Sequence, residues 1–143
     1  MSTSHGSFVW HELMTSDPAA AMAFYGSVVS WSVQHSPVPG MDYWMLKAGE
    51  IPVCGLMSVP EDAKASGARP MWVGYVGVDD VDAATAKAKK LGGVVYRPPQ
   101  DIPDVGRFSI FRCSKASITE SASPPSLGSF YAARQWRGCG GSG

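Results

Sequence analysis

Residues 72–96, WVGYVGVDDVDAATAKAKKLGGVVY, repeat the pattern of residues 8–31, FVWHELMTSDPAAAMAFYGSVVSW, at a shift of 63 positions. The shift places Asp17 on Asp80, and three alanines of the first stretch fall on alanines of the second. In each copy a strand-forming run precedes the Asp, and a Gly-ended helical run follows it. Asp is a favourable N-cap residue, so each helix is predicted to begin directly after it. We therefore predict an internal duplication.

Three strand-forming segments follow the first predicted helix: SWSVQHS at 30–36, DYWMLKAG at 42–49 and IPVCGLMSV at 51–59. Gly49 favours a hairpin between the last two. To within one residue, the same shift carries SWSV onto GVVY and DYWMLKA onto DVGRFSI. Each copy is thus predicted to hold one strand, one helix and three more strands.

Such a unit cannot bury both faces of its short, curved sheet alone, so the two copies are expected to share one core. The predicted fold class is α+β, with two βαβββ units at about 7–60 and 70–122 inside a single domain that spans 1–143. Between them, PEDAKASGARP is predicted to be a linker. The tail at 123–143 is rich in Ser and Gly and is predicted to be disordered or aberrant.

Composition narrows the possible partners. The 12 basic and 12 acidic residues give no net charge, which argues against binding to nucleic acid or an anionic membrane. No apolar run approaches the ~20 residues of a membrane span, and MSTSHGS lacks the features of a signal peptide. The distant Cys54, Cys113 and Cys139 suit neither a disulfide framework nor a zinc knuckle, so a cytoplasmic location is expected.

The stretches ELMTSDPAAAMAFYGSVVSW and VGYVGVDDVDAATAKAKKLGG resemble the vicinal oxygen chelate superfamily, the group of glyoxalases, bleomycin-resistance proteins and extradiol dioxygenases. The resemblance covers residues 7–111, and HELMT is similar to a glyoxalase-like or hydroxylase-like bacterial branch. It implies that the curved sheets form a cup. It also implies a divalent metal inside the cup, held by His, Gln or Glu from the first and last strands of each unit.

The expected metal ligands are incomplete. The resemblance places a first-strand ligand seven residues before each capping Asp, where this sequence has Trp10 and Val73. In the last strands it implies Met57 and, at the same shift, Glu120, which is the one residue of this set with ligand chemistry. Since metal sites of this kind need three protein ligands, we predict no cofactor. The alternative is a divalent ion such as Zn, Fe, Mn or Ni.

His11 and Glu12 are neighbours on the first predicted strand, so their side chains should point to opposite faces. Glu12 shares the parity of Trp10 and should face the cup, as a solvent-exposed rim residue or as a catalytic, substrate-facing group. His11 should face outward, packed beneath the helix or at a dimer interface. A bulge would reverse this assignment and make His11 a metal candidate.

The remaining cup lining is predicted to be aromatic and rich in sulfur, with Arg107 near the mouth. Such side chains suit a planar or hydrophobic small molecule, although they could equally be ordinary core packing. The predicted lining residues are Trp10, Met14, Trp44, Met57 and Tyr75.

Two functions remain open at this point. One is a metal-free protein that binds a small molecule, and the other is a metal-dependent glyoxalase, lyase or dioxygenase in which Glu12 moves a proton. A homodimer is expected, because the edges of each sheet invite pairing. The resemblance also implies an Asp-Pro-x-Gly turn, which this sequence lacks. The two interpretations of this absence are a reading-frame change near residue 112 and a native low-complexity tail.

Overall fold

The computed structural model describes residues 5–36, 40–65, 67–103, 106–112 and 130–136. The chain divides into two compact units. The N-terminal unit holds Trp10–Val73, and the C-terminal unit holds Met1–Val9 together with Gly74–Gly143.

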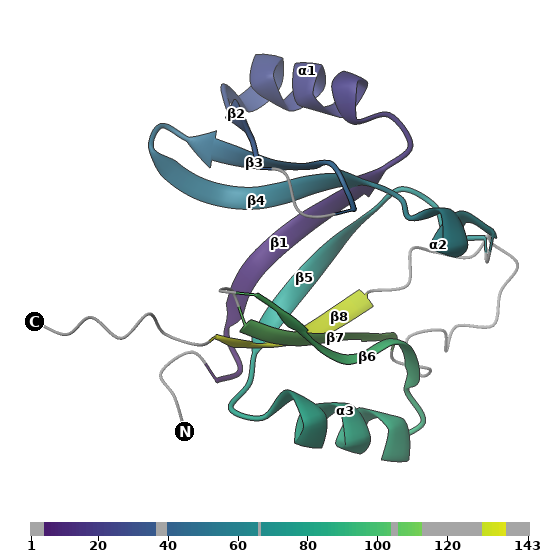
Figure 1. Ribbon diagram of the computed structural model, residues 1–143. Coiled ribbons are helices and arrows are strands. Elements are labelled where there is room, and N and C mark those ends of the chain that lie inside the picture. The colour runs from purple at the N-terminus through teal and green to yellow at the C-terminus, as the bar shows by residue number, and fades with distance from the viewer. Residues whose placement is uncertain (1–4, 37–39, 66, 104–105, 113–129, 137–143) are drawn as a thin grey trace, which may run out of the picture. The chain divides into compact units, whose positions relative to one another are not determined.

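The N-terminal unit consists of a four-stranded sheet, with α1 against one face, and a short second helix. Its strands lie in the order β2-β3-β4-β1, with β1 parallel to β4 and the other pairs antiparallel (Figure 1). The elements are β1 (Phe8–Thr15, whose first two residues belong to the C-terminal unit), α1 (Pro18–Val29), β2 (Ser32–His35), β3 (Tyr43–Ala48), β4 (Ile51–Ser58) and α2 (Glu61–Ala65). The predicted strand, helix and three strands are therefore all present.

Helix α1 begins where the sequence predicts. The Asp17 side chain accepts a hydrogen bond from the backbone N–H of Ala20 at 3.0 Å, and Pro18 occupies the first helical position. The helix ends at Ser30, which adopts a left-handed conformation with φ 58°. The expectation of a Gly-ended helix is wrong for this copy, because Ser30 takes the position that Gly usually fills.

The core of the N-terminal unit lies between α1 and its sheet. It is built on Leu13, Leu46, Cys54 and Leu56, which are almost fully buried. Partly buried side chains that pack against this cluster are Ala21, Met22, Tyr25, Trp31, Trp44 and Val53. Since side chains alternate along a strand, the neighbours of these core residues on β1, β3 and β4 point to the other face of the sheet.

The sequence predicted a hairpin turn at Gly49 and a linker after β4, and the structure shows both connections. Gly49 has φ 62° in the turn of the β3–β4 hairpin, which confirms the predicted turn. The segment between Pro60 and Pro70 is more than a linker, because α2 forms within it. Glu61 accepts a hydrogen bond from Lys64 at 2.7 Å on this helix, a pair whose spacing favours helical structure.

The C-terminal unit repeats the same connectivity. Its strands lie in the order β5-β8-β7-β6, with β5 parallel to β8 and the other pairs antiparallel (Figure 1). The elements are β5 (Met71–Gly77, whose first three residues belong to the N-terminal unit), α3 (Val81–Lys90), β6 (Val94–Ile102), β7 (Gly106–Arg112) and β8 (Phe130–Trp136). The fold is α+β with two βαβββ units, and the internal duplication is confirmed.

Helix α3 is capped and packed like a counterpart of α1. Asp80 accepts a hydrogen bond from the backbone N–H of Ala83 at 2.9 Å, and Gly92 follows the helix with φ 90°. On the sheet side, the hydroxyl groups of Thr85 and Ser109 lie 2.6 Å apart, and both side chains are buried. This hydrogen bond fixes α3 on β7.

The last strand departs from the sequence-based expectation. A shift of 63 from Ile51 predicts a strand that starts at residue 114, whereas β8 starts at Phe130. Residues 130–136 of the tail predicted to be disordered or aberrant therefore form a strand, and residues 113–122, the end of the second predicted unit, lie outside the described residues. The physical reason is that FYAARQW pairs with both β5 and β7 and so satisfies the backbone groups of both strands.

Candidate functional site

The candidate site is the face of the N-terminal sheet that points away from α1, which we call the Glu12 face. Pairing sets Glu12 opposite Gly55 and Met14 opposite Met57 across β1 and β4. It also sets Met45 opposite Gly55 across β3 and β4. The residues of the Glu12 face are Trp10, Glu12, Met14, Tyr43, Met45, Gly55 and Met57.

Three side chains of this face form a hydrogen-bonded series. The indole Nε1 of Trp10 donates to the hydroxyl oxygen of Tyr43 at 3.1 Å. That hydroxyl in turn donates to Oε2 of Glu12 at 3.0 Å. Only 8% of Glu12 is exposed, and burying a carboxylate is costly unless hydrogen bonds replace its water. The Tyr43 hydroxyl provides one such bond.

The ring of Tyr43 occupies space that only a glycine leaves open. Gly55 is buried in the middle of β4, and a Cβ built there would overlap the Tyr43 hydroxyl oxygen and the ring carbon that carries it. Glycine inside a strand weakens it and marks close approach by another group. Here the approaching group is the phenol that contacts Glu12.

Thioethers surround this polar series. Met57 is 7% exposed and pairs with both Met14 and Tyr43 across the sheet, and Met45 lies on the same face. Methionine is polarisable and flexible, so it adapts to the outline of an apolar partner. The Glu12 face thus combines one held carboxylate with apolar, deformable surroundings.

Trp10 and Glu12 lie on one face of β1, as strand alternation predicts, since both contact Tyr43. Glu12 is too buried to be the solvent-exposed rim residue that was one alternative. His11 points the other way and is exposed, so it does not pack beneath the helix. Its place at an interface between chains, and the roles of Trp10 and Glu12 in binding, stay predictions.

Trp44 does not belong to the Glu12 face. It packs against the buried cluster under α1 and pairs with Leu56, so the prediction that it lines the same surface as Met57 is wrong. The structure supplies the correction, because buried Leu46 anchors β3 to the core and fixes the parity of its neighbours. That parity gives Tyr43 to the Glu12 face. Sequence reasoning missed Tyr43 and Gly55.

Two further predicted lining residues lie in the C-terminal unit. Tyr75 is 6% exposed and its ring centroid lies 6.4 Å from that of Phe108 on β7. Arg107 is on β7 as predicted, but its side chain points to the opposite face. Its Nε and Nη2 donate to Asp82 of α3 at 2.6 and 2.9 Å. Tyr75 and Arg107 therefore lie on opposite faces of the C-terminal sheet, and their roles in binding stay predictions.

The contact between Arg107 and Asp82 shifts the pKa of both side chains. The hydrogen bond from Arg107 lowers the pKa of Asp82 below its ordinary 3.8, and the same contact raises the pKa of Arg107. Asp101 adds a weaker contact, 3.5 Å from Nη1 of Arg107. Because both carboxylates hold this guanidinium on the α3 side of the sheet, we assign Arg107 a structural role.

The candidate ligand Glu120 lies outside the described residues. The structure assigns its expected position to another residue, because Gly77 pairs with Arg134 on β8 as Met14 pairs with Met57 on β4. The 63-residue shift fails at this strand, and the inference that made Glu120 the counterpart of Met57 fails with it.

The side chains of the Glu12 face do not fit the metal that the resemblance implies. Within the described ranges, no three His, Cys, Asp or Glu side chains lie together in a way that could hold a metal ion. On the Glu12 face, Glu12 stands among a phenol, an indole and thioethers, and it accepts a hydrogen bond from Tyr43. Zn²⁺ and Fe²⁺ sites need three good donors.

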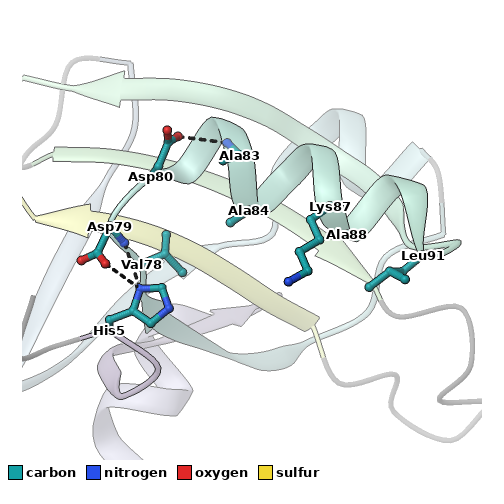
Figure 2. A pocket seen from close by; sticks show the side chains of 9 residues that line it. All are labelled: His5, Val78, Asp79, Asp80, Ala83, Ala84, Lys87, Ala88 and Leu91. Carbon is teal, nitrogen blue, oxygen red and sulfur yellow. Dashed lines mark hydrogen bonds and ion pairs between the residues drawn. The ribbon is translucent and has the colours of Figure 1, made fainter. Parts of the chain in front are cut away.

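A second feature is a pocket of about 460 Å³ beside α3 in the C-terminal unit (Figure 2). At one end His5 pairs with Asp79 at 3.2 Å, while Asp80 points to the backbone of Ala83. These polar groups hold the N-terminal segment and cap the helix, so we assign them a structural role.

In the part of the chain that the structure describes, no helix is both long and apolar enough to span a membrane.

Comparison with known proteins gives a family. The sequence model of the Glyoxalase/Bleomycin resistance protein/Dioxygenase superfamily matches residues 7–114. "Putative glyoxylase CFP32" of Mycobacterium tuberculosis is 39% identical over 122 residues, which are 83% of this chain and 44% of that protein. "Anthracycline biosynthesis protein DnrV" of Streptomyces peucetius is 32% identical over 68% of this chain and 34% of its own length. The chain spans less than half the length of these relatives.

Solved structures show the same fold. Methylmalonyl-CoA epimerase from Mycobacterium tuberculosis has a TM-score of 0.61 at 16% identity, over 96% of this chain and 93% of that one. Streptomyces coelicolor methylmalonyl-CoA epimerase in complex with 2-nitronate-propionyl-CoA has a TM-score of 0.60 at 17% identity, over 93% of this chain and 96% of that one. At such identity the likeness extends to the fold and no further.

Proposed function

Because the chain belongs to the Glyoxalase/Bleomycin resistance protein/Dioxygenase superfamily, we propose that its Glu12 face binds a small organic molecule without a metal ion. The observation that carries the proposal is a buried carboxylate, held by Tyr43, on a surface of indole, phenol and thioether groups. Core packing alone does not account for this carboxylate, because burying an ionisable group costs free energy.

The chemistry of the face defines the ligand class. The side chains of Trp10, Met14 and Met57 favour a planar or apolar body, through stacking and sulfur–aromatic contacts. Glu12 accepts hydrogen bonds, so the ligand should carry a hydroxyl, amide or ammonium donor. We infer a planar aromatic compound with a phenolic donor as the best-suited class.

The relatives support a small-molecule ligand. DnrV is named for anthracycline biosynthesis, and anthracyclines are planar, hydroxylated aromatic compounds. The Streptomyces coelicolor epimerase was solved with 2-nitronate-propionyl-CoA bound, which is also a small molecule. These names describe those proteins, and the name of DnrV agrees with the ligand class that the Glu12 face favours.

Titration with alizarin red S, a sulfonated dihydroxyanthraquinone, tests the proposal. Measured by calorimetry in excess EDTA, the protein should bind it with a saturable isotherm. Glu12→Gln should weaken binding about tenfold, because the neutral amide is a poorer acceptor for the phenol donor. The matched control is Glu50→Gln, since the side chain of Glu50 is 97% exposed in the β3–β4 turn. Equal affinity in both variants would contradict the proposal.

A second candidate is an enzyme of glyoxalase type, and the name of the CFP32 relative favours it. In that case Glu12 would take a proton from a substrate with adjacent oxygen atoms. The test is turnover of the hemithioacetal of methylglyoxal and glutathione, with metal content measured before and after chelation. Stoichiometric metal, lost together with turnover on chelation, would replace metal-free binding by this function.

A further inference from the structure

We propose that Tyr43 is the positioning residue of the Glu12 face, and that Gly55 provides the space in which it works. This inference rests on the proposed function. It adds that Tyr43 orients the Glu12 carboxylate, so that the site selects ligands carrying a hydrogen-bond donor over otherwise similar ligands without one.

The direction of the hydrogen bonds follows from the chemistry of the three groups. An indole N–H can only donate, so Tyr43 must accept from Trp10 at 3.1 Å. A hydroxyl has a single proton, and that of Tyr43 is left to point to Glu12 at 3.0 Å. Trp10 therefore fixes the hydroxyl rotor, and the hydroxyl fixes one oxygen of the carboxylate.

Gly55 of β4 also restricts the position of the Tyr43 phenol. Gly55 pairs with Glu12 on one side and with Met45 on the other, so it lies in the row of the sheet that carries the carboxylate. Any side chain at position 55 would overlap the Tyr43 hydroxyl oxygen. The ring can reach Glu12 only because β4 has no Cβ at this place.

The molecule contains a natural comparison for this arrangement. Trp72 Nε1 donates to the hydroxyl of Tyr25 at 3.2 Å, which is the same indole-to-phenol contact in the same unit. Tyr25 lies in α1, next to the core cluster under the helix. Tyr25→Phe therefore removes a hydroxyl bonded to an indole and leaves the Glu12 face untouched.

The first test is on the ligand-free protein. In ¹H–¹⁵N spectra, the indole N–H signal of Trp10, assigned with Trp10→Phe, should move in Tyr43→Phe and stay in place in Tyr25→Phe. It should also move in Gly55→Ala, because the added Cβ displaces the ring. An unchanged Trp10 signal in Tyr43→Phe overturns the proposal, whether or not a ligand is ever found.

The second test measures selectivity. Dissociation constants are compared for alizarin red S and for anthraquinone-2-sulfonate, which lacks the two hydroxyl groups. Tyr43→Phe should reduce the preference for the hydroxylated compound about tenfold, and Tyr25→Phe should retain it. Retained preference in a folded Tyr43→Phe overturns the positioning role. If the wild-type protein binds neither compound, the proposed function fails, and the spectra still decide whether Tyr43 is held as described.

Discussion

At the scale of single residues, the carboxyl group of Glu12 is the feature that ordinary core packing does not explain. Strand alternation predicted its face from the sequence, because a period of two leaves no freedom once Trp10 is placed. Tyr43 was not predicted, since a choice between Tyr43 and Trp44 depends on which β3 residue enters the core. Only the packing of Leu46 decides that.

His11 gives a prediction that separates the two faces of β1. The side chain is exposed and lies opposite in parity to Glu12, so His11→Ala should change the free energy of unfolding by no more than about 0.5 kcal/mol. Ligand affinity should also be unchanged. Urea denaturation and calorimetry on the same preparation check both values, and loss of binding would return His11 to the list of candidate site residues.

Cys54 should be an inert thiol. Burial raises its pKa to about 11, so almost no thiolate is present in the folded protein at neutral pH. Iodoacetamide labelling at pH 7.5, followed by peptide mapping, should find Cys54 unmodified until urea unfolds the chain. Because the unfolded thiol ionises near 9.0, this group should also lower stability as the pH rises above that value. Rapid labelling under native conditions would contradict this prediction.

Asp82 should contribute to stability in a way that depends on pH. Its pKa is lowered by Arg107, so its contribution is present above the ordinary value of 3.8 and is lost as the pH falls through the lower folded value. Asp82→Asn should therefore be less stable than wild type at pH 7 and equal to it at strongly acid pH. Denaturation midpoints at low ionic strength check this, and a difference that persists in acid would refute it.

At the scale of elements, the starts of the helices were the most predictable features. Asp17 and Asp80 each receive a backbone N–H three residues ahead, as their sequence pattern predicts. The position of β8 could not be predicted. Pairing of Tyr131 and its neighbours with β5 and β7 joins segments far apart in sequence, and no local pattern fixes the length of chain that precedes β8.

The cap of α3 and the glycine of α1 allow a paired test. Asp80→Ala removes the bond to Ala83 and should cost about 1 kcal/mol of stability. Gly26→Ala should stabilise the protein by roughly 0.5 to 1 kcal/mol, because a Cβ there comes no closer than 3.6 Å to other atoms. Thermal melts of the two variants should shift in opposite directions. Shifts in the same direction would show that the helices do not follow these local rules.

At the scale of the whole molecule, the two copies differ at the positions that form the Glu12 face. A shift of 63 places Glu12 on Tyr75 and Met45 on Phe108, and these two aromatic rings are 6.4 Å apart in the C-terminal unit. The two copies therefore keep the same connectivity while their equivalent faces differ in chemistry. Sequence comparison could predict the repeat of elements, whereas the divergence of the faces required the strand pairing.

Metal-free binding at the Glu12 face is tested by methyl spectroscopy of the methionines during titration with alizarin red S in excess EDTA. Met14, Met45 and Met57 lie on the Glu12 face, while Met22 packs against the core cluster under α1. We expect saturable shifts of the first three methyl signals and a constant Met22 signal. A shift confined to Met22, or shifts of the first three that occur only after a divalent metal replaces the chelator, would contradict this expectation.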